Sequence, residues 1–176
     1  MADRISIKSK IMNKLIPIIC ILFIGCKGNS QEKENVKPNT ATKTTQYKVT
    51  KTEAEWRKQL TDIQFYVLRK AGTEKAGTSE LLHNKEKGVY VCAGCGTHLF
   101  KSEHKYDSGT GWPSFDREIK GNVAFEVDNK LGIIRTEEHC AVCGGHLGHV
   151  FNDGPRKTTG KRHCINGAAL KFVPEN

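Results

Sequence analysis

Apolar residues recur at helical intervals near the start of the candidate folded part, at Trp56, Leu60, Ile63 and Val67. Steps of three and four residues place such side chains on one face of a helix. Within this stretch Thr61 is followed three residues later by Gln64, which is the spacing of a capping box at a helix start. We therefore expect two short helices in place of one continuous helix.

The pattern changes after the glycine-containing segment 72–88, where short runs of β-type residues appear. We expect strands at 89–91, 123–127 and 131–136, and one further strand through Cys164 to Phe172. Asp128-Asn129-Lys130 separates two of these runs and has the composition of a hairpin turn. Helices come first and strands later, without βαβ alternation. This order predicts a mainly β fold, an antiparallel sheet domain with helices at one end.

The N-terminal 26 residues have a separate pattern. Three lysines precede an apolar run, Leu15 to Ile24, that is too short for an ordinary transmembrane span and is typical of a signal peptide. The run ends at Gly25-Cys26, which resembles the lipobox of bacterial lipoproteins, where the chain is cleaved before an acylated cysteine. We expect residues 1–25 to be a lipoprotein-type signal peptide and Cys26 to anchor the protein to the bacterial cell envelope, facing the periplasm or the exterior. An uncleaved anchor, a plain secretory signal and a start at Met12 are the alternatives.

Residues 27–51 are mostly Asn, Lys, Glu, Gln, Thr and Ser and cannot bury a core. We expect residues 26–51 to be a lipidated cysteine with a flexible polar tether, and residues 52–176 to be the folded domain. The net charge of +9 lies mainly on the N-terminal arm. Residues 1–51 carry ten Lys or Arg against three Asp or Glu, whereas residues 52–176 carry eighteen against sixteen. The folded part is nearly balanced, so no nucleic-acid partner is expected.

Four of the seven cysteines form two matched motifs, Cys92-x-x-Cys95-Gly and Cys140-x-x-Cys143-Gly. Two tight turns with paired thiolates can supply the four sulfurs of a closed, tetrahedral structural zinc site. Two disulfides or a redox-active pair are the alternatives, although a thioredoxin-like motif requires a βαβ context that is absent. A catalytic zinc is disfavoured because four cysteines leave no open position. We expect one structural Zn²⁺ per chain, holding distant hairpins together.

Cys164 is left outside these motifs. Its sequence neighbours are Arg162, His163 and Asn166, and His146 and His149 lie three apart in a glycine-containing segment upstream. Histidine and arginine favour the reactive thiolate, which makes Cys164 a candidate nucleophile. A buried structural cysteine, and core or metal-ligating histidines, are the alternative interpretations. Trp112 lies between glycines in a loop, where it either belongs to the core or lines a pocket.

Together these segments resemble one family. The residues that carry the likeness are the two CxxC motifs, Lys105-Tyr-Asp-Ser-Gly-Thr-Gly-Trp-Pro-Ser-Phe115, Arg135-Thr-Glu, Gly145-His-Leu-Gly-His-Val-Phe-Asn-Asp-Gly-Pro155 and Arg162-His-Cys-Ile-Asn166. In this order, from about Trp56 to Phe172, they are similar to the B-type peptide-methionine (R)-S-oxide reductases. The resemblance implies two antiparallel β-sheets with short N-terminal helices, and a zinc remote from the catalytic centre. It makes 52–176 the catalytic domain.

The resemblance also implies roles for individual residues. Cys164 would attack the sulfoxide sulfur and become a sulfenic acid, while His146 and His149 would orient and protonate the oxygen. Asp153 and Asn166 would support this polar network. Trp112 would receive the S-methyl group, and Phe151 would help to form the pocket wall. The implied substrate is the R epimer of methionine sulfoxide in oxidised proteins or peptides, and we expect the enzyme to be a monomer.

The chain departs from the family at Thr110. Many members carry a resolving cysteine at this position, two residues before the pocket tryptophan, that forms a disulfide with the oxidised nucleophile. Here the zinc motifs, Cys164, the signal peptide and Cys26 account for every cysteine. We therefore expect reduction by an external thiol or by a thioredoxin-like partner. The competing functions are a zinc-stabilised module that binds protein or lipid partners without turnover, and a zinc-dependent hydrolase or deaminase. A binding module would not need the reactive residues Cys164, His146, His149 and Trp112. A zinc-dependent hydrolase or deaminase would need an open coordination position on the metal.

Overall fold

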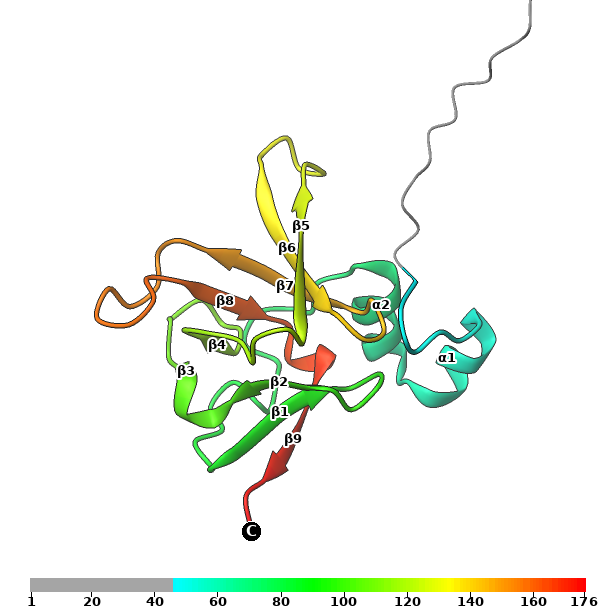
Figure 1. Ribbon diagram of the computed structural model, residues 1–176, viewed down its shortest axis with the longest axis horizontal. Coiled ribbons are helices and arrows are strands. Elements are labelled where there is room, and N and C mark those ends of the chain that lie inside the picture. Colours follow the sequence, from blue (N-terminus) through cyan, green and yellow to red (C-terminus); the bar gives the residue numbers. More distant parts are fainter. Residues whose placement is uncertain (1–45) are drawn as a thin grey trace, which may run out of the picture. The chain divides into compact units, whose positions relative to one another are not determined.

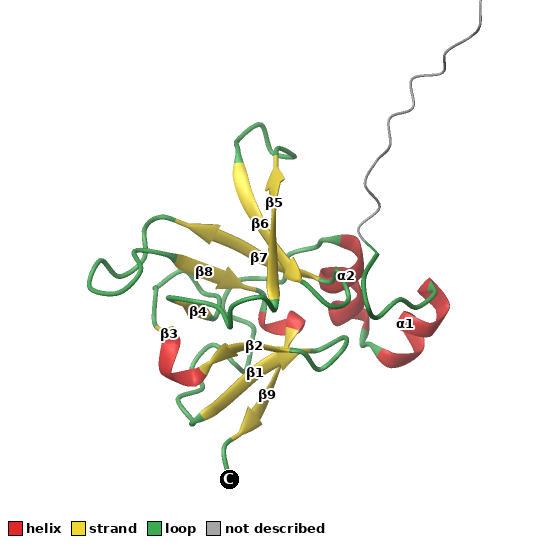
Figure 2. Cartoon of the chain, viewed as in Figure 1, coloured by secondary structure: helices red, strands yellow, loops and turns green. Residues whose placement is uncertain are grey.

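The computed structural model describes residues 46–176, so the expected signal peptide, Cys26 and most of the expected tether lie outside the described residues. In the described part the strands form two antiparallel sheets, preceded by two short helices (Figure 1, Figure 2). The fold class predicted from the sequence is confirmed. No helix in residues 46–176 is long and apolar enough to cross a membrane.

The smaller sheet has the order β2–β1–β9, with strands β2 (His98–Lys101), β1 (Gly88–Cys92) and β9 (Leu170–Pro174). The larger sheet has the order β3–β4–β8–β7–β6–β5, with strands β3 (Lys105–Tyr106), β4 (Ser114–Phe115), β8 (Arg162–Ile165), β7 (His146–Phe151), β6 (Arg135–Cys140) and β5 (Val123–Asp128). Two 3₁₀ turns, η1 (Ser102–His104) and η2 (Gly167–Ala169), precede β3 and β9. The hairpin of β5 and β6 projects beyond the rest of the larger sheet (Figure 1).

The two helices are α1 (Glu53–Gln59) and α2 (Asp62–Lys70), and each begins with a complete capping box. The box at Thr61 and Gln64 divides the stretch in two, as predicted. The expectation that Ile63 shares the buried face is wrong, because Ile63 is 46% exposed. Thr61 has an extended backbone, so the helical pattern of α1 does not continue into α2. The buried side chains of α2 are Phe65, Val67 and Leu68.

Ordered packing begins before Thr52. The Val49 N–H donates to the Val142 carbonyl oxygen at 3.0 Å. The Tyr47 ring meets the His139 ring edge-on, with centroids 6.1 Å apart. The folded part therefore includes the last residues of the polar segment, which contribute the Val49 main chain and the Tyr47 ring to the domain.

Two expected strands have different limits in the structure. The residues Leu131–Ile134 form an exposed turn, and β6 begins only at Arg135. The expected strand from Cys164 to Phe172 is two strands in different sheets, β8 and β9, separated by η2. The segment around His146, treated as glycine-rich from its sequence, is strand β7. The hairpin turn at Asp128–Lys130 is confirmed, with the Lys130 N–H bound to the Asp128 carboxylate.

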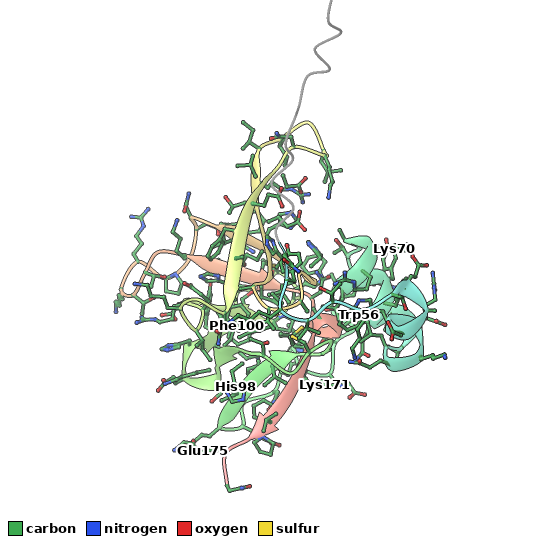
Figure 3. All side chains as sticks on the ribbon, turned by 45° about the vertical axis from the view of Figure 1, so that its right-hand side comes forward. Trp56, Lys70, His98, Phe100, Lys171 and Glu175 are labelled. Atoms are coloured by element: carbon green, nitrogen blue, oxygen red, sulfur yellow. The ribbon has the colours of Figure 1, made fainter. Side chains whose placement is uncertain are left out.

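The core lies where the two sheets face each other. Phe100 of β2 stacks on Phe115 of β4 with ring centroids 4.4 Å apart, and Tyr90 of β1 meets Phe115 edge-on at 5.0 Å. All three side chains are fully buried. Trp56 of α1 lies between the helices and the sheets (Figure 3), where its ring faces Gly94 in the β1–β2 turn. This packing fixes the larger sheet, which carries most of the candidate site.

Candidate active site and four-cysteine cluster

The two CxxC motifs meet in space although 44 residues separate them. Cys92 ends β1 and Cys140 ends β6, and in each case the second cysteine lies in the turn that follows. In both turns the N–H of the glycine after the second cysteine donates to the carbonyl of the first at 2.8 Å. Both glycines have a φ near +70°, namely 76° at Gly96 and 69° at Gly144, which residues with a Cβ rarely adopt. The glycine thus lets each motif fold back on itself.

The four sulfur atoms of the cluster lie within 4.8 Å of one another. Cys92 Sγ is 3.7 Å from Cys143 Sγ, and Cys95 Sγ is 3.5 Å from Cys140 Sγ. A disulfide requires about 2.05 Å, whereas ligands about 2.3 Å from a tetrahedral zinc lie roughly 3.8 Å apart. The cluster is therefore consistent with a metal site, and the disulfide alternative does not fit.

The four thiols also shift one another's pKa values, because their sulfur atoms lie so close together. Hydrogen bonding from Cys140 is the main cause that lowers the pKa of Cys95, and hydrogen bonding from Cys143 lowers that of Cys140. The pKa values of Cys92 and Cys143 are raised, in both cases chiefly through Cys140. Four mutually coupled thiols can all ionise only when a cation compensates their charge, which is what a bound dication does.

Cys164 lies on β8, directly opposite His149 of β7. Gly148 makes this close pairing possible, because a Cβ at that position would lie 2.1 Å from the Cys164 carbonyl oxygen. The sulfur is partly exposed, and its recorded polar neighbour is the Thr110 hydroxyl, 3.7 Å from Cys164 Sγ. Cys164 is thus held on a rigid strand with its thiol accessible, and Thr110 lies at the position expected of a resolving residue.

Each of the two histidines is bound to a carboxylate. His146 Nδ1 lies 2.6 Å from Glu137 Oε1, and His149 Nε2 lies 2.8 Å from Asp128 Oδ2. The imidazole ring centroids are 5.6 Å apart, and the ring planes are inclined at 66° to each other. When each neutral imidazole donates to its carboxylate, its other nitrogen is left without a proton. The carboxylates therefore set the orientation and the tautomer of both histidines.

Strand pairing explains why these carboxylates reach the histidines. Glu137 of β6 lies opposite His149, and Asp128 of β5 lies opposite Arg135. Arg135 Nη2 donates to Asp128 at 2.5 Å. The Lys130 main chain, and then the neighbouring histidine and arginine, hydrogen-bond to Asp128 and hold the pKa of this carboxyl well below its usual range. Asp128 therefore remains an anion beside the site.

These residues surround a pocket of about 140 Å³. It is lined by Thr73, Trp112, Arg135, Gly148, His149, Phe151, Cys164 and Asn166. The structure therefore brings together five of the seven predicted catalytic and substrate-binding residues. His146 contacts this set through the His149 ring, and Asp153 lies outside it.

Comparison with known proteins identifies the family. The family model for the SelR domain matches residues 60–174. A peptide methionine sulfoxide reductase MsrB from Leptospira interrogans is 55% identical over 130 residues, which cover 73% of this chain and 98% of the relative. The chain belongs to the MsrB family. An MsrB from Leifsonia xyli is 52% identical over 74% of this chain and 95% of its own length, and the mouse mitochondrial methionine-R-sulfoxide reductase B3 is 50% identical over 72% of this chain and 50% of its own length.

Asp153 and Asn166 occupy different environments in this MsrB. Asp153 is exposed and binds Arg162 through two contacts of 2.9 Å, with Arg162 stacked over the Phe151 ring. Asp153 is therefore connected to the pocket through Arg162, which lies over the pocket residue Phe151. Asn166 is buried, its Nδ2 donates to the Leu147 carbonyl at 2.9 Å, and its Oδ1 accepts from a main-chain N–H at 2.9 Å.

The sequence did not assign a role to Glu137, Asp128 or Arg135. Arg135 and Glu137 belong to a segment that contributed to the family resemblance but was given no role in the reaction. Asp128 was interpreted only as a turn residue. Their contacts depend on the register of β5, β6 and β7, which the hydrophobic pattern does not specify. In this MsrB, Glu137 and Asp128 each bind one of the two histidines, and Arg135 binds Asp128.

Replacing Glu137 with glutamine should lower the pKa of His146 further. Burial already lowers it below the ordinary value of 6.5, and the Glu137 carboxylate opposes that effect. A neutral amide would no longer stabilise the imidazolium, so His146 should take up its proton at a lower pH. Proton-detected NMR titration of the histidine rings measures this. Glu126→Gln is the matched control, because Glu126 is exposed and pairs opposite Glu137 on β5; an unchanged or raised midpoint in Glu137→Gln would contradict the assignment.

The same shift has a consequence for stability. Because the folded-state pKa of His146 lies below its unfolded value, the unfolded chain binds the proton first as the pH falls. This histidine should therefore reduce the stability of the fold below about pH 6.5. Above that pH the histidine is neutral in the folded and the unfolded chain, so it causes no loss of stability.

Proposed function

We propose that this member of the MsrB family reduces the R epimer of protein-bound methionine sulfoxide with Cys164 as its nucleophile. Family membership gives the peptide methionine sulfoxide reductase activity. The observation that supports the residue assignment is the shared pocket, in which Cys164, His149 and Trp112 line one small cavity. A thiol, a proton source and an aromatic wall are what reduction of a methyl sulfoxide requires.

The chemistry balances with these groups. The Cys164 sulfur attacks the sulfoxide sulfur, and the protonated oxygen leaves as water as the S–O bond breaks. Water then attacks the Cys164 sulfur, the new S–S bond breaks, and a cysteine sulfenic acid remains. Methionine is released, and one thiol has been oxidised by two electrons. The oxygen departs only when it is protonated. A histidine in its imidazolium form would provide that proton through the nitrogen that does not face a carboxylate.

The pocket also explains how one epimer would be selected. Trp112 and Phe151 would provide an apolar surface for the methyl group, while His149 and Arg135 supply polar groups to the same pocket. In the opposite epimer, the methyl group and the oxygen would exchange places. An unsatisfied sulfoxide oxygen against an indole is unfavourable, because a buried polar group without a hydrogen bond loses its hydration.

Regeneration would need a thiol from outside the chain. In residues 46–176 every cysteine other than Cys164 belongs to the four-cysteine cluster. The sulfenic acid would condense with an external thiol to a mixed disulfide and release water, and a second thiol would then restore Cys164. A small thiol or a thioredoxin-like protein can supply both reducing equivalents.

Mass spectrometry after a single turnover tests this pathway. With one equivalent of substrate and no reductant, we expect the intact protein to gain one oxygen, and dimedone to label Cys164. Thr110→Cys is the informative comparison, since the Thr110 side chain contacts Cys164 Sγ. That variant should lose two hydrogens by forming an internal disulfide. An internal disulfide in the unmodified sequence would refute the external-thiol pathway.

The metal is proposed to be a single structural Zn²⁺ held by Cys92, Cys95, Cys140 and Cys143. The sulfur separations and the all-thiolate donor set support this choice. When bound, a four-coordinate zinc with four protein ligands supplies cross-linking and no open position for substrate. It would hold the β1–β2 turn against the β6–β7 turn.

The cellular location is proposed to be the bacterial cell envelope, with Cys26 as the lipid anchor. The lysine-rich start, the short apolar run and the Gly25-Cys26 pair support this. The substrates there would be oxidised envelope proteins. Labelling with a radioactive fatty acid should mark the protein and leave Cys26→Ala unlabelled, and label in that variant would contradict the anchor.

A further inference from the structure

Glu74 is a buried residue beside the pocket, and its carboxylate has no part in the chemistry described above. It follows α2 in the chain, next to Thr73, which lines the pocket. Only 6% of its surface is exposed. Within residues 46–176 it has no recorded salt bridge, and its carboxylate accepts hydrogen bonds from the main-chain N–H groups of Gly167 and Ala168. A buried carboxylate held by main-chain donors alone indicates a fixed structural position.

Glu74 holds the polar wall of the pocket through Asn166. Gly167 and Ala168 are the first residues of η2, whose N–H groups have no partner within so short a turn, and Asn166 immediately precedes them. The Glu74 main-chain N–H donates to Asn166 Oδ1 at 2.9 Å, while Asn166 Nδ2 donates to the Leu147 carbonyl. Residues 166–168 are therefore bound to Glu74 at three points, two residues beyond the nucleophile.

Glu74 holds the apolar wall through Trp112. The indole Nε1–H donates to the Glu74 carbonyl oxygen at 3.2 Å. A second bond strengthens the connection between the two loops, because the Gly77 N–H donates to the Gly111 carbonyl at 2.8 Å. The orientation of the indole therefore depends on where the main chain of residues 74–77 lies.

From these contacts we propose that Glu74 is a positioning residue of the reductase, fixing the separation between Trp112 and Asn166. The inference rests on the proposed function, in which the methyl group lies against one wall and the oxygen against the other side. The carboxylate sets the position of residue 74 relative to η2, and the main chain of the same residue transmits that position to the indole. A change in its side chain should therefore move both walls.

The chemical requirement is for two acceptor oxygens at this place. Glutamine keeps one oxygen, but turns an NH₂ group toward the second main-chain donor, so one bond is replaced by a donor–donor contact. Aspartate keeps both oxygens and the charge, but its side chain is one methylene shorter. We expect kcat/KM for an R-sulfoxide peptide to fall at least tenfold in Glu74→Gln and by a smaller factor in Glu74→Asp.

The test compares both variants with Glu80→Gln, which changes an exposed glutamate of the same loop. The purified full-length proteins are assayed with R-epimer peptide and dithiothreitol, and the Trp112 indole N–H is followed by ¹⁵N–¹H NMR. We expect the control to match the parent protein and the indole signal to shift in both Glu74 variants. A general loss of stability would lower the melting temperature but would not move the indole signal of the folded protein. It would also give no partial rescue by aspartate.

Each outcome has a definite meaning. A folded Glu74→Gln protein with kcat/KM within threefold of the control, or with an unmoved indole signal, overturns the proposal. If Glu74→Gln does not fold, Glu74→Asp decides alone: a loss of threefold or more with a shifted indole signal supports the positioning role, and a parental rate overturns it. A control that fails to reduce the R epimer would instead refute the proposed function itself.

Discussion

Cys164→Ser should abolish reduction of the R epimer by this protein, with a loss of at least roughly a thousandfold in kcat. A serine hydroxyl is almost never ionised near neutral pH, and its oxygen cannot accept a second oxygen to form the counterpart of a sulfenic acid. The two-electron step therefore has no other route on this strand. The measurement is methionine formation from separate R- and S-sulfoxide peptides with dithiothreitol as reductant.

The control is the state of the fold. Serine is nearly isosteric with cysteine, and Cys164 is only partly buried, so the variant should retain its circular dichroism and its bound metal. The parent protein should reduce the R epimer alone. Residual turnover by folded Cys164→Ser above one per cent of the parent rate would show that another group carries the reaction. Any expression fragment should begin no later than Gln46, because Tyr47 and Val49 pack on the domain.

The second large effect is expected from the four-cysteine cluster. Cys140→Ser removes a fully buried sulfur at the end of β6 and should abolish high-affinity zinc binding. Structural zinc contributes an apparent free energy on the order of 10 kcal/mol in small domains, which is comparable to the whole stability of a domain of this size. The variant should therefore be unfolded, or melt at least 20 °C lower, as measured by circular dichroism with metal analysis.

Cys164→Ser is the matched comparison, since it changes the same type of residue outside the cluster. That protein should contain one zinc per chain and melt close to the parent. A strong chelator added to the parent protein at elevated temperature should reproduce the effect of Cys140→Ser. A folded, active Cys140→Ser protein without metal would contradict the structural role.

Local signals in the sequence were sufficient for some features and insufficient for others. The capping box at Thr61 and the CxxC-Gly motifs act over a few residues, so both could be predicted. The exposure of Ile63 could not, because it depends on how α2 is rotated after the break. The exposed turn at Leu131–Ile134 has the composition of a strand and was misjudged for that reason.

The candidate site shows the same division. Cys164, His149 and Trp112 were identified from motifs, and the structure brings them to one pocket. Glu137 and Asp128 act across strands, so their function depends on register, and register is set by packing of the whole sheet. Glu74 was not identified because its carboxylate binds main-chain N–H groups of residues more than 90 positions away, which leave no side-chain pattern.

The β6–β7 hairpin carries two cysteines of the cluster near its turn, and His146, the first residue of β7, follows Cys143 by only three residues. With the proposed zinc at this turn, a zinc-starved cell would lose methionine repair together with the fold of the protein. Once its turn was no longer cross-linked, the strand that holds the histidines would lose its fixed position. Methionine repair by this protein would then depend on metal supply as well as on thiol supply.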